Sequence, residues 1–142
     1  APFVRGKEEK AFSRDMTIFD STIGARFPNP TILQQFGGDT MPETAQNVAE
    51  DLGISRESAD AFAARSQQRY QDARERGFFR EEIAPVTVPQ GRKKDPLTVT
   101  DDEHPRPGTG VDKLAKLPAI VDGGIVTAGN ASGVNDGAAA LI

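Results

Sequence analysis

The sequence has no cysteine and no tryptophan, and His104 is its only histidine. Without cysteine, these residues can form no disulfide, no thiolate nucleophile and no Cys-type metal cage. A histidine cluster is excluded as well, because the chain has only one histidine. We therefore assign no catalytic residue and no metal ligand to this chain.

Long apolar runs are also missing. None approaches the roughly 18 residues of a membrane span, and the start lacks the apolar centre of a signal peptide. We therefore expect a cytoplasmic location and no membrane partner. The 17 basic and 21 acidic residues give a net charge of −4, which argues against a general nucleic-acid binder.

Length and composition suit one modest domain, with 142 residues of which 37% are hydrophobic. Both ends are apolar, at residues 1–4 and 141–142, whereas domain boundaries usually fall in polar linkers. We interpret the chain as a piece of a longer one.

Two main helices are predicted in the first half. Thr40 stands three residues before Glu43, the capping-box spacing, and Gly53 ends the helix that begins there. Ser55 caps a longer helix over 56–76, which Gly77 closes. The apolar or small residues expected to form the buried faces are Ala45, Val48, Ala49 and Leu52 in the first helix, and Ala59, Phe62, Ala63, Ser66, Tyr70 and Ala73 in the second.

The remaining elements are short. Residues 16–30 suggest extended pieces, and 31–36 a turn of helix. Alternation over 82–88 and 96–100 predicts a hairpin with a basic tip. The tip residues Arg92, Lys93 and Lys94 could steer an anionic ligand, or could form a plain solvated turn.

His104 follows Asp101, Asp102 and Glu103, but adjacent residues in a proline-rich loop cannot all face one point. We therefore assign no catalysis or metal binding to His104. Arg106 differs, because Pro105 and Pro107 restrict the backbone on both sides of it. Its planar guanidinium suits phosphate binding or stacking on adenine.

Residues 126–140 form a small, polar, glycine-rich stretch followed by an apolar run. Such a loop could cradle a phosphate or a polar cofactor arm, or could simply connect two elements. It is not a P-loop, and its glycines lack the G-x-G-x-x-G spacing of dinucleotide folds.

Three stretches in order along the chain resemble the thiolase family of acyltransferases. They are F-S-R…F-D-S-T-I-G-x-R-F-x-N-P over 12–30, M-x-x-T-A-x-N-V-A…S-R-x-x-x-D-A-F-A-x-R-S-Q-Q-R over 41–69, and TAGNASGVNDGAAAL over 127–141. The resemblance implies an α/β, thiolase-like fold, here the inserted loop domain that covers the coenzyme A site. Residues 1–15 would connect from the N-terminal core, 16–125 would form the loop domain, and 126–142 would return to the N-terminal catalytic core.

By the same resemblance, the parent protein would be an acetyl-CoA C-acyltransferase that uses acyl-CoA as substrate, as a homodimer or tetramer. Its acyl transfer needs a cysteine nucleophile, a second cysteine and a histidine, so this piece alone is expected to be inactive. The residues that match coenzyme A contacts of the family are Ile32, Met41, Arg106, Lys113, Ala128, Gly129 and Ser132. Thr40 and Lys113 depart from the family, which often has His and Ser at these positions.

Some alternatives stay open. From the residues alone, Met41 could be a flexible gap filler instead of a substrate contact. The chain could be a standalone, non-catalytic coenzyme A-binding or structural α/β module. Acetoacetyl-CoA and 3-oxoadipyl-CoA are both compatible substrates, in either reaction direction.

Overall fold

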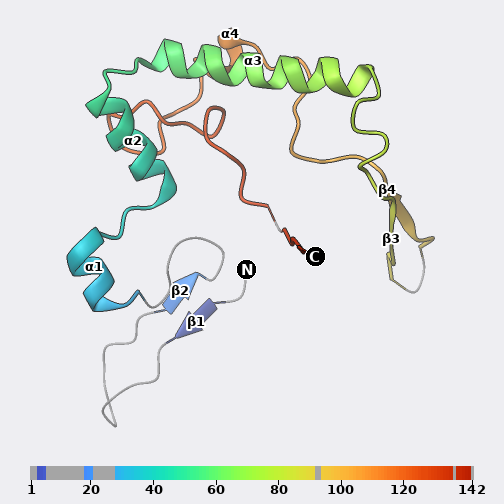
Figure 1. The fold of residues 1–142 in the computed structure, drawn as a ribbon, viewed down its shortest axis with the longest axis horizontal. Helices are drawn as coiled ribbons and strands as arrows, with labels where there is room; N and C mark the ends of the chain where they lie inside the picture. The colour runs from blue at the N-terminus through green and yellow to red at the C-terminus, as the bar shows by residue number, and fades with distance from the viewer. Residues whose placement is uncertain (1–2, 6–17, 21–27, 92–93, 136, 142) are drawn as a thin grey trace. The chain divides into compact units, whose positions relative to one another are not determined.

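The computed structural model describes residues 3–5, 18–20, 28–91, 94–135 and 137–141 (Figure 1). The chain divides into two compact units, Ala1–Thr44 and Ala45–Ile142. Helices and short strands are both present, and the two longest helices and a small hairpin occur where the sequence predicts them. The mixed architecture expected from the sequence is therefore confirmed.

The first unit contains a short antiparallel pair and one short helix. Strand β1 (Phe3–Arg5) pairs with β2 (Ile18–Asp20), with Val4 opposite Phe19. Helix α1 (Pro30–Phe36) begins where the Asn29 side chain accepts a hydrogen bond from the Thr31 amide, at 2.9 Å. The expected turn of helix is confirmed, and α1 buries none of its side chains.

Helix α2 (Met41–Asp51) begins at the predicted capping box. The Thr40 amide and hydroxyl both donate to Glu43 Oε2, at 2.6 and 2.7 Å. These bonds, led by the one from the Thr40 backbone, lower the pKa of Glu43. At the other end, Gly53 has φ 62° and the Ile54 amide donates to the Ala49 carbonyl, as the predicted glycine stop requires.

The predicted buried face of α2 is wrong at three of its four positions. Ala45 and Val48 are exposed, and Leu52 is 71% exposed, so that only Ala49 is buried. Gln46 is buried in their place, because its side-chain carbonyl accepts from the Ile125 amide at 2.8 Å. Helical spacing shows which residues share a face but not what covers that face.

Helix α3 (Arg56–Glu75) matches the predicted long helix. The Ser55 hydroxyl accepts from the Ser58 amide, and Gly77, at φ 74°, ends the helix as expected. The predicted face needs correction, because Phe62 is 63% exposed, with the Arg65 guanidinium over its ring, and Ser66 is exposed too. The most buried residue of α3 is instead Asp60, at 1% exposure.

The predicted hairpin is confirmed, with shorter strands. Strand β3 (Val86–Val88) pairs antiparallel with β4 (Leu97–Val99), Thr87 lying opposite Thr98. Of the three tip cations, Arg92 and Lys93 lie outside the described residues, while Lys94 is exposed. Their suggested role in steering a ligand stays a prediction.

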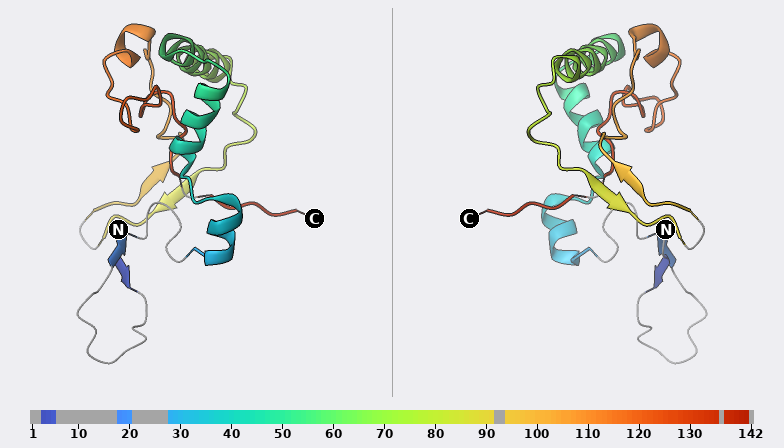
Figure 2. Two further views of the ribbon diagram at one scale, coloured as in Figure 1. Left: turned by 90° about the vertical axis from the view of Figure 1, so that its left-hand side faces the viewer. Right: turned by 90° about the vertical axis from the view of Figure 1, so that its right-hand side faces the viewer.

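The core of the second unit is small, and half of its buried side chains are polar. Among the described residues, the buried apolar side chains are Ala49, Leu114 and Val126, and the buried polar ones are Gln46, Asp60 and Thr127. Helix α4 (Val111–Leu114) lies beside α3 in both views of Figure 2, and the following chain turns back in an isolated bridge between Ala119 and Thr127. The described helices are all too short or too polar to traverse a lipid bilayer.

Candidate functional site

An arginine paired with a buried carboxylate joins α3 to the loop that contains α4. Arg56 Nε donates to Asp60 Oδ2 at 2.8 Å, one helical turn along α3. A second nitrogen of the same guanidinium donates to the carbonyls of Leu114 and Leu117, at 2.8 and 2.9 Å. Arg56 therefore neutralises Asp60 and also satisfies carbonyl groups at the end of α4.

The other oxygen of Asp60 is bound to the glycine-rich stretch. Asn130 Nδ2 donates to Asp60 Oδ1 and to the Ile125 carbonyl, both at 2.9 Å. Asn130 Oδ1 in turn accepts from the Thr127 amide at 2.7 Å. We call residues 125–132 the polar turn. Its conformation depends on one asparagine amide whose two ends are both hydrogen-bonded.

Thr127 completes the polar turn from within. Its side chain is fully buried, and its hydroxyl accepts from the amides of Gly129 and Asn130, at 3.2 and 3.3 Å. The Ala131 amide donates to the Thr127 carbonyl. With these bonds, no buried side-chain polar atom within the described residues lacks a partner.

Gly129 lies against α4 and the residues that follow it. A Cβ at Gly129 would overlap Leu114 Cδ2 and Leu117 Cδ1. Glycine is therefore needed here for close approach between the polar turn and the two leucines. Leu114 and Leu117 also supply the carbonyls that Arg56 binds. The hydrogen bonds of Arg56 and the packing of Gly129 therefore act on the same region, where α3, the end of α4 and the polar turn meet, which we call the junction.

Gly129→Ala is expected to destabilise this junction by about 1–3 kcal/mol, because the added methyl must displace Leu114 or Leu117. Hydrogen exchange of residues 119–131 in the full-length protein would measure the loss as faster exchange. Gly110→Ala is the matched control, since Gly110 has an ordinary φ of −117° and a Cβ there meets open space. Equal exchange in both variants would contradict the expected overlap.

Five of the seven residues expected to contact coenzyme A fall in two groups. Arg106 and Lys113 lie on the loop leading into α4 and are exposed. The Arg106 amide donates to Gln67 Oε1 on α3 at 3.0 Å, and Lys113 Nζ donates to the Gly108 carbonyl at 2.8 Å. Ala128 and Ser132 are exposed on the polar turn, with the half-buried Gly129 between them.

The structure thus connects these five residues through α3, α4 and the junction at Asp60. Ile32 and Met41 belong to the other unit, Ala1–Thr44, and are exposed there, Met41 at 74%. That exposure leaves both residues available to a ligand, and the role suggested for them stays a prediction.

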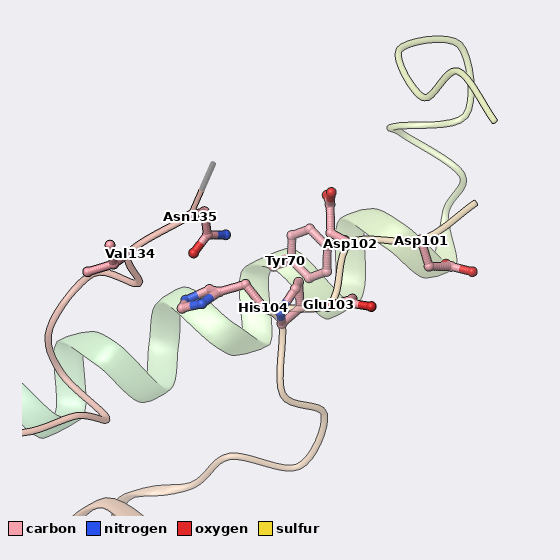
Figure 3. A pocket seen from close by; sticks show the side chains of 8 residues that line it. Tyr70, Asp101, Asp102, Glu103, His104, Val134 and Asn135 are labelled. Atoms are coloured by element: carbon pink, nitrogen blue, oxygen red, sulfur yellow. The ribbon is translucent and has the colours of Figure 1, made fainter. Parts of the chain in front are cut away.

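His104 lines an open hollow of about 780 Å³ beside α3 (Figure 3). Its ring extends toward the segment that carries Val134 and Asn135, and it lies so close to Gly133 that a Cβ there would be 2.5 Å from two ring atoms. The other lining residues are Tyr70, Asp101, Asp102, Glu103 and Pro105. The acidic residues do not converge on the ring, and no metal-binding group of three or more ligands occurs among the described residues.

Asp101 at the edge of this hollow is held by α3. Arg74 donates to Asp101 Oδ1 at 2.5 Å, and this bond is the main reason that the pKa of Asp101 is lowered. Both side chains are largely exposed, so the pair adds little stability. The bond links the loop before Arg106 to α3.

The sequence analysis did not identify Arg56, Asp60 and Gln67. These three residues of α3 bind the loop of Arg106 and Lys113 and the polar turn. One signal was present, because Asp60 interrupts a face of small residues between Ala59 and Ala63, with an arginine four residues before it. A charged residue on a face expected to be buried, with a cation at that spacing, indicates a buried ion pair. Nothing in the sequence indicated that Asn130 would be the third member.

Comparison with known proteins gives a consistent result. The model of the thiolase N-terminal domain matches residues 9–142. The chain is 58% identical to a beta-ketoadipyl-CoA thiolase of Pseudomonas aeruginosa and 57% identical to the 3-oxoadipyl-CoA/3-oxo-5,6-dehydrosuberyl-CoA thiolase of Escherichia coli K12. Each alignment covers 100% of this chain and 35% of the relative, so the chain spans about a third of their length.

The fold agrees with the sequence match. The crystal structure of human mitochondrial 3-ketoacyl-CoA thiolase superposes with a TM-score of 0.73 at 36% identity, over 94% of this chain and 32% of that one. The matched range includes α3, α4 and the polar turn, in the order that the resemblance implied. The chain therefore belongs to the thiolase family, and its residues 9–142 match the N-terminal domain of that family.

Proposed function

We propose that this chain is the coenzyme A-binding loop domain of a thiolase, together with the segment that returns to the N-terminal catalytic core. The loop domain would comprise residues 16–125, with 1–15 leading into it and 126–142 returning to the core. The match of residues 9–142 to the thiolase N-terminal domain supports the family of the parent protein. The division into a loop domain and a core segment rests on the order of the three resembling stretches along the chain. The parent protein would be a cytoplasmic homo-oligomer that uses acyl-CoA and no metal.

The proposed reaction is thiolysis of 3-oxoadipyl-CoA, which the names of the relatives at 57–58% identity favour over acetoacetyl-CoA. A cysteine thiolate attacks the 3-oxo carbon, the bond between C2 and C3 breaks, and acetyl-CoA leaves after its C2 is protonated. The thiol of a second coenzyme A then takes the acyl group from the cysteine. The sequence has no cysteine, so the nucleophile must be supplied by other residues of the parent protein.

Within this chain, the proposed role is to bind the coenzyme A part of the substrate. Arg106 and Lys113 offer exposed cations on a loop whose backbone is bound to α3, which suits the phosphates of coenzyme A. Ala128, Gly129 and Ser132 would contact the pantetheine arm, with the Ser132 hydroxyl as hydrogen-bonding group. Ile32 and Met41 would contribute apolar contacts along the acyl-pantetheine channel.

Arg106→Ala in the full-length protein tests this assignment. We expect the KM for coenzyme A to rise about tenfold with kcat nearly unchanged, because a charge-assisted bond to phosphate contributes to binding more than to the chemical step. Steady-state thiolysis of 3-oxoadipyl-CoA measures both constants. Arg69→Ala is the matched control, an exposed arginine on α3.

An unchanged KM in Arg106→Ala would remove Arg106 from the site. No thiolysis by the full-length protein with any 3-oxoacyl-CoA would overturn the proposed function itself. The standalone alternative has a separate test, because an antibody to this chain should detect a native product well above 15.2 kDa in cell extract. A product of 15.2 kDa would favour a coenzyme A-binding module without catalysis.

A further inference from the structure

We infer that Asp60 is a positioning residue for the acyl-CoA site, acting through Asn130 on the polar turn; this inference rests on the function proposed above. The hydrogen-bond partners of the Asp60 carboxylate, Arg56 and Asn130, are not among the residues proposed to touch the ligand. One carboxylate oxygen binds Asn130 on the polar turn. The other binds Arg56 on the same helix, and the Arg56 guanidinium in turn binds the loop around α4. Both the polar turn and that loop contain some of those residues.

The first segment is the loop around α4. Asp60 Oδ2 accepts from Arg56, whose guanidinium also donates to the Leu114 and Leu117 carbonyls. Lys113 directly precedes Leu114 in this segment. The position of Arg56, and with it the end of α4, therefore depends on the Asp60 carboxylate.

The second segment is the polar turn. Asp60 Oδ1 accepts from Asn130 Nδ2, which also donates to the Ile125 carbonyl, while Asn130 Oδ1 accepts from the Thr127 amide. These three bonds define the plane of the Asn130 amide and its direction toward α3. Ala128, Gly129 and Ser132 are within two residues of Asn130, so rotation of that amide would move their backbone.

Because Asp60 is buried, each of its carboxylate oxygens depends on a protein donor. Asp60 is 1% exposed, so water cannot replace a lost donor at either oxygen. An amide at this position has one acceptor and one donor end, and its donor end must face either Arg56 or the Asn130 amino group. Asp60→Asn thus breaks one of the two connections while leaving the shape of the side chain unchanged.

The test exchanges the aspartate at position 60 and the asparagine at position 130 in the full-length protein, first singly and then together. Asp60→Asn is expected to raise the KM for coenzyme A about tenfold with kcat within about twofold of wild type, because a displaced turn weakens ligand binding before it affects chemistry supplied elsewhere. Asn130→Asp alone should raise KM further, because it places two carboxylates face to face and also opposes the Ile125 carbonyl.

The double variant Asp60→Asn/Asn130→Asp should recover part of the loss. In it the carbonyl end of the new amide on α3 can accept from Arg56, and the amino end of that amide can donate to the new carboxylate on the polar turn. The connection is thereby remade with its polarity reversed. Loss of folded protein alone would lower the maximal rate and leave KM unchanged, so a KM that rises in each single variant and falls again in the double variant reports coupling of the two side chains to ligand binding. Asp72→Asn is the matched control, an aspartate on α3 that accepts from Gln68 at 2.8 Å, and its KM should not change.

Asn130→Ser provides a second route if Asp60→Asn does not fold. It leaves the pair between Arg56 and Asp60 intact and removes the amide of Asn130 with its bonds to Asp60, Ile125 and Thr127, so a raised KM is again expected. Unchanged KM in Asp60→Asn or Asn130→Ser, with Arg106→Ala still impaired, would overturn this inference and leave the proposed function standing. Failure of the wild-type protein to bind coenzyme A would overturn both.

Discussion

The 142-residue chain, purified alone, is expected to cleave 3-oxoadipyl-CoA at no more than the background rate. Thiolase chemistry requires a thiolate that attacks a carbonyl carbon and holds the acyl group as a thioester. The chain has no cysteine, and serine or threonine hydroxyls would need an activating base. The only histidine, His104, contacts Gly133 and lines an open hollow beside acidic residues, not a nucleophile.

The measurement is the loss of the 3-oxoacyl-CoA enolate absorbance on addition of coenzyme A, with the full-length protein assayed beside the chain. The expected difference spans the whole catalytic rate, commonly a factor of ~10⁶ or more over the uncatalysed reaction. Thiolysis by the chain alone that survives removal of trace full-length enzyme would refute the assignment of the chemistry to residues outside it.

Arg56→Ala is expected to lower the free energy of local opening around the polar turn by about 3 kcal/mol, because it leaves the Asp60 carboxylate buried without its cation. It also leaves the Leu114 and Leu117 carbonyls without their donor. Removing one partner of a buried ion pair costs about 3–5 kcal/mol. The lower end applies because the Arg56 side chain is 23% exposed.

Hydrogen exchange in the full-length protein would register this loss as roughly 100-fold faster exchange of the amides of Thr127, Gly129 and Asn130. Arg69→Ala, an exposed position on the same helix, is the control, and about 0.5 kcal/mol or less is expected there. Equal protection in the two variants would show that the Arg56 contacts add no net stability.

Helix boundaries were predictable because they depend on neighbours along the chain. Thr40 with Glu43, and Ser55 with Ser58, form their capping bonds within three residues, and Gly53 and Gly77 adopt the positive φ that ends a helix. The hairpin followed in the same way from alternation on both sides of a turn.

Buried faces were less predictable. Phe62 and Leu52 fall on apolar faces by spacing but are exposed, whereas Gln46 and Asp60 are buried. Their burial depends on partners 79 and 70 residues away, because Gln46 binds the Ile125 amide and Asp60 binds Asn130. Hydrogen bonds across such separations leave no periodic signal in either helix.

The sequence alone determined the family, the helix ends, the hairpin and the lack of a thiol nucleophile, because motifs, caps and composition are local or additive properties. Only the tertiary structure decided that the ion pair of Arg56 and Asp60 on α3 joins the loop of Arg106 and Lys113 to the polar turn of Ala128, Gly129 and Ser132. The physical reason is that a buried charge needs hydrogen-bond partners, and those partners can lie far away along the chain. Sequence spacing within one helix does not show which distant residues they are.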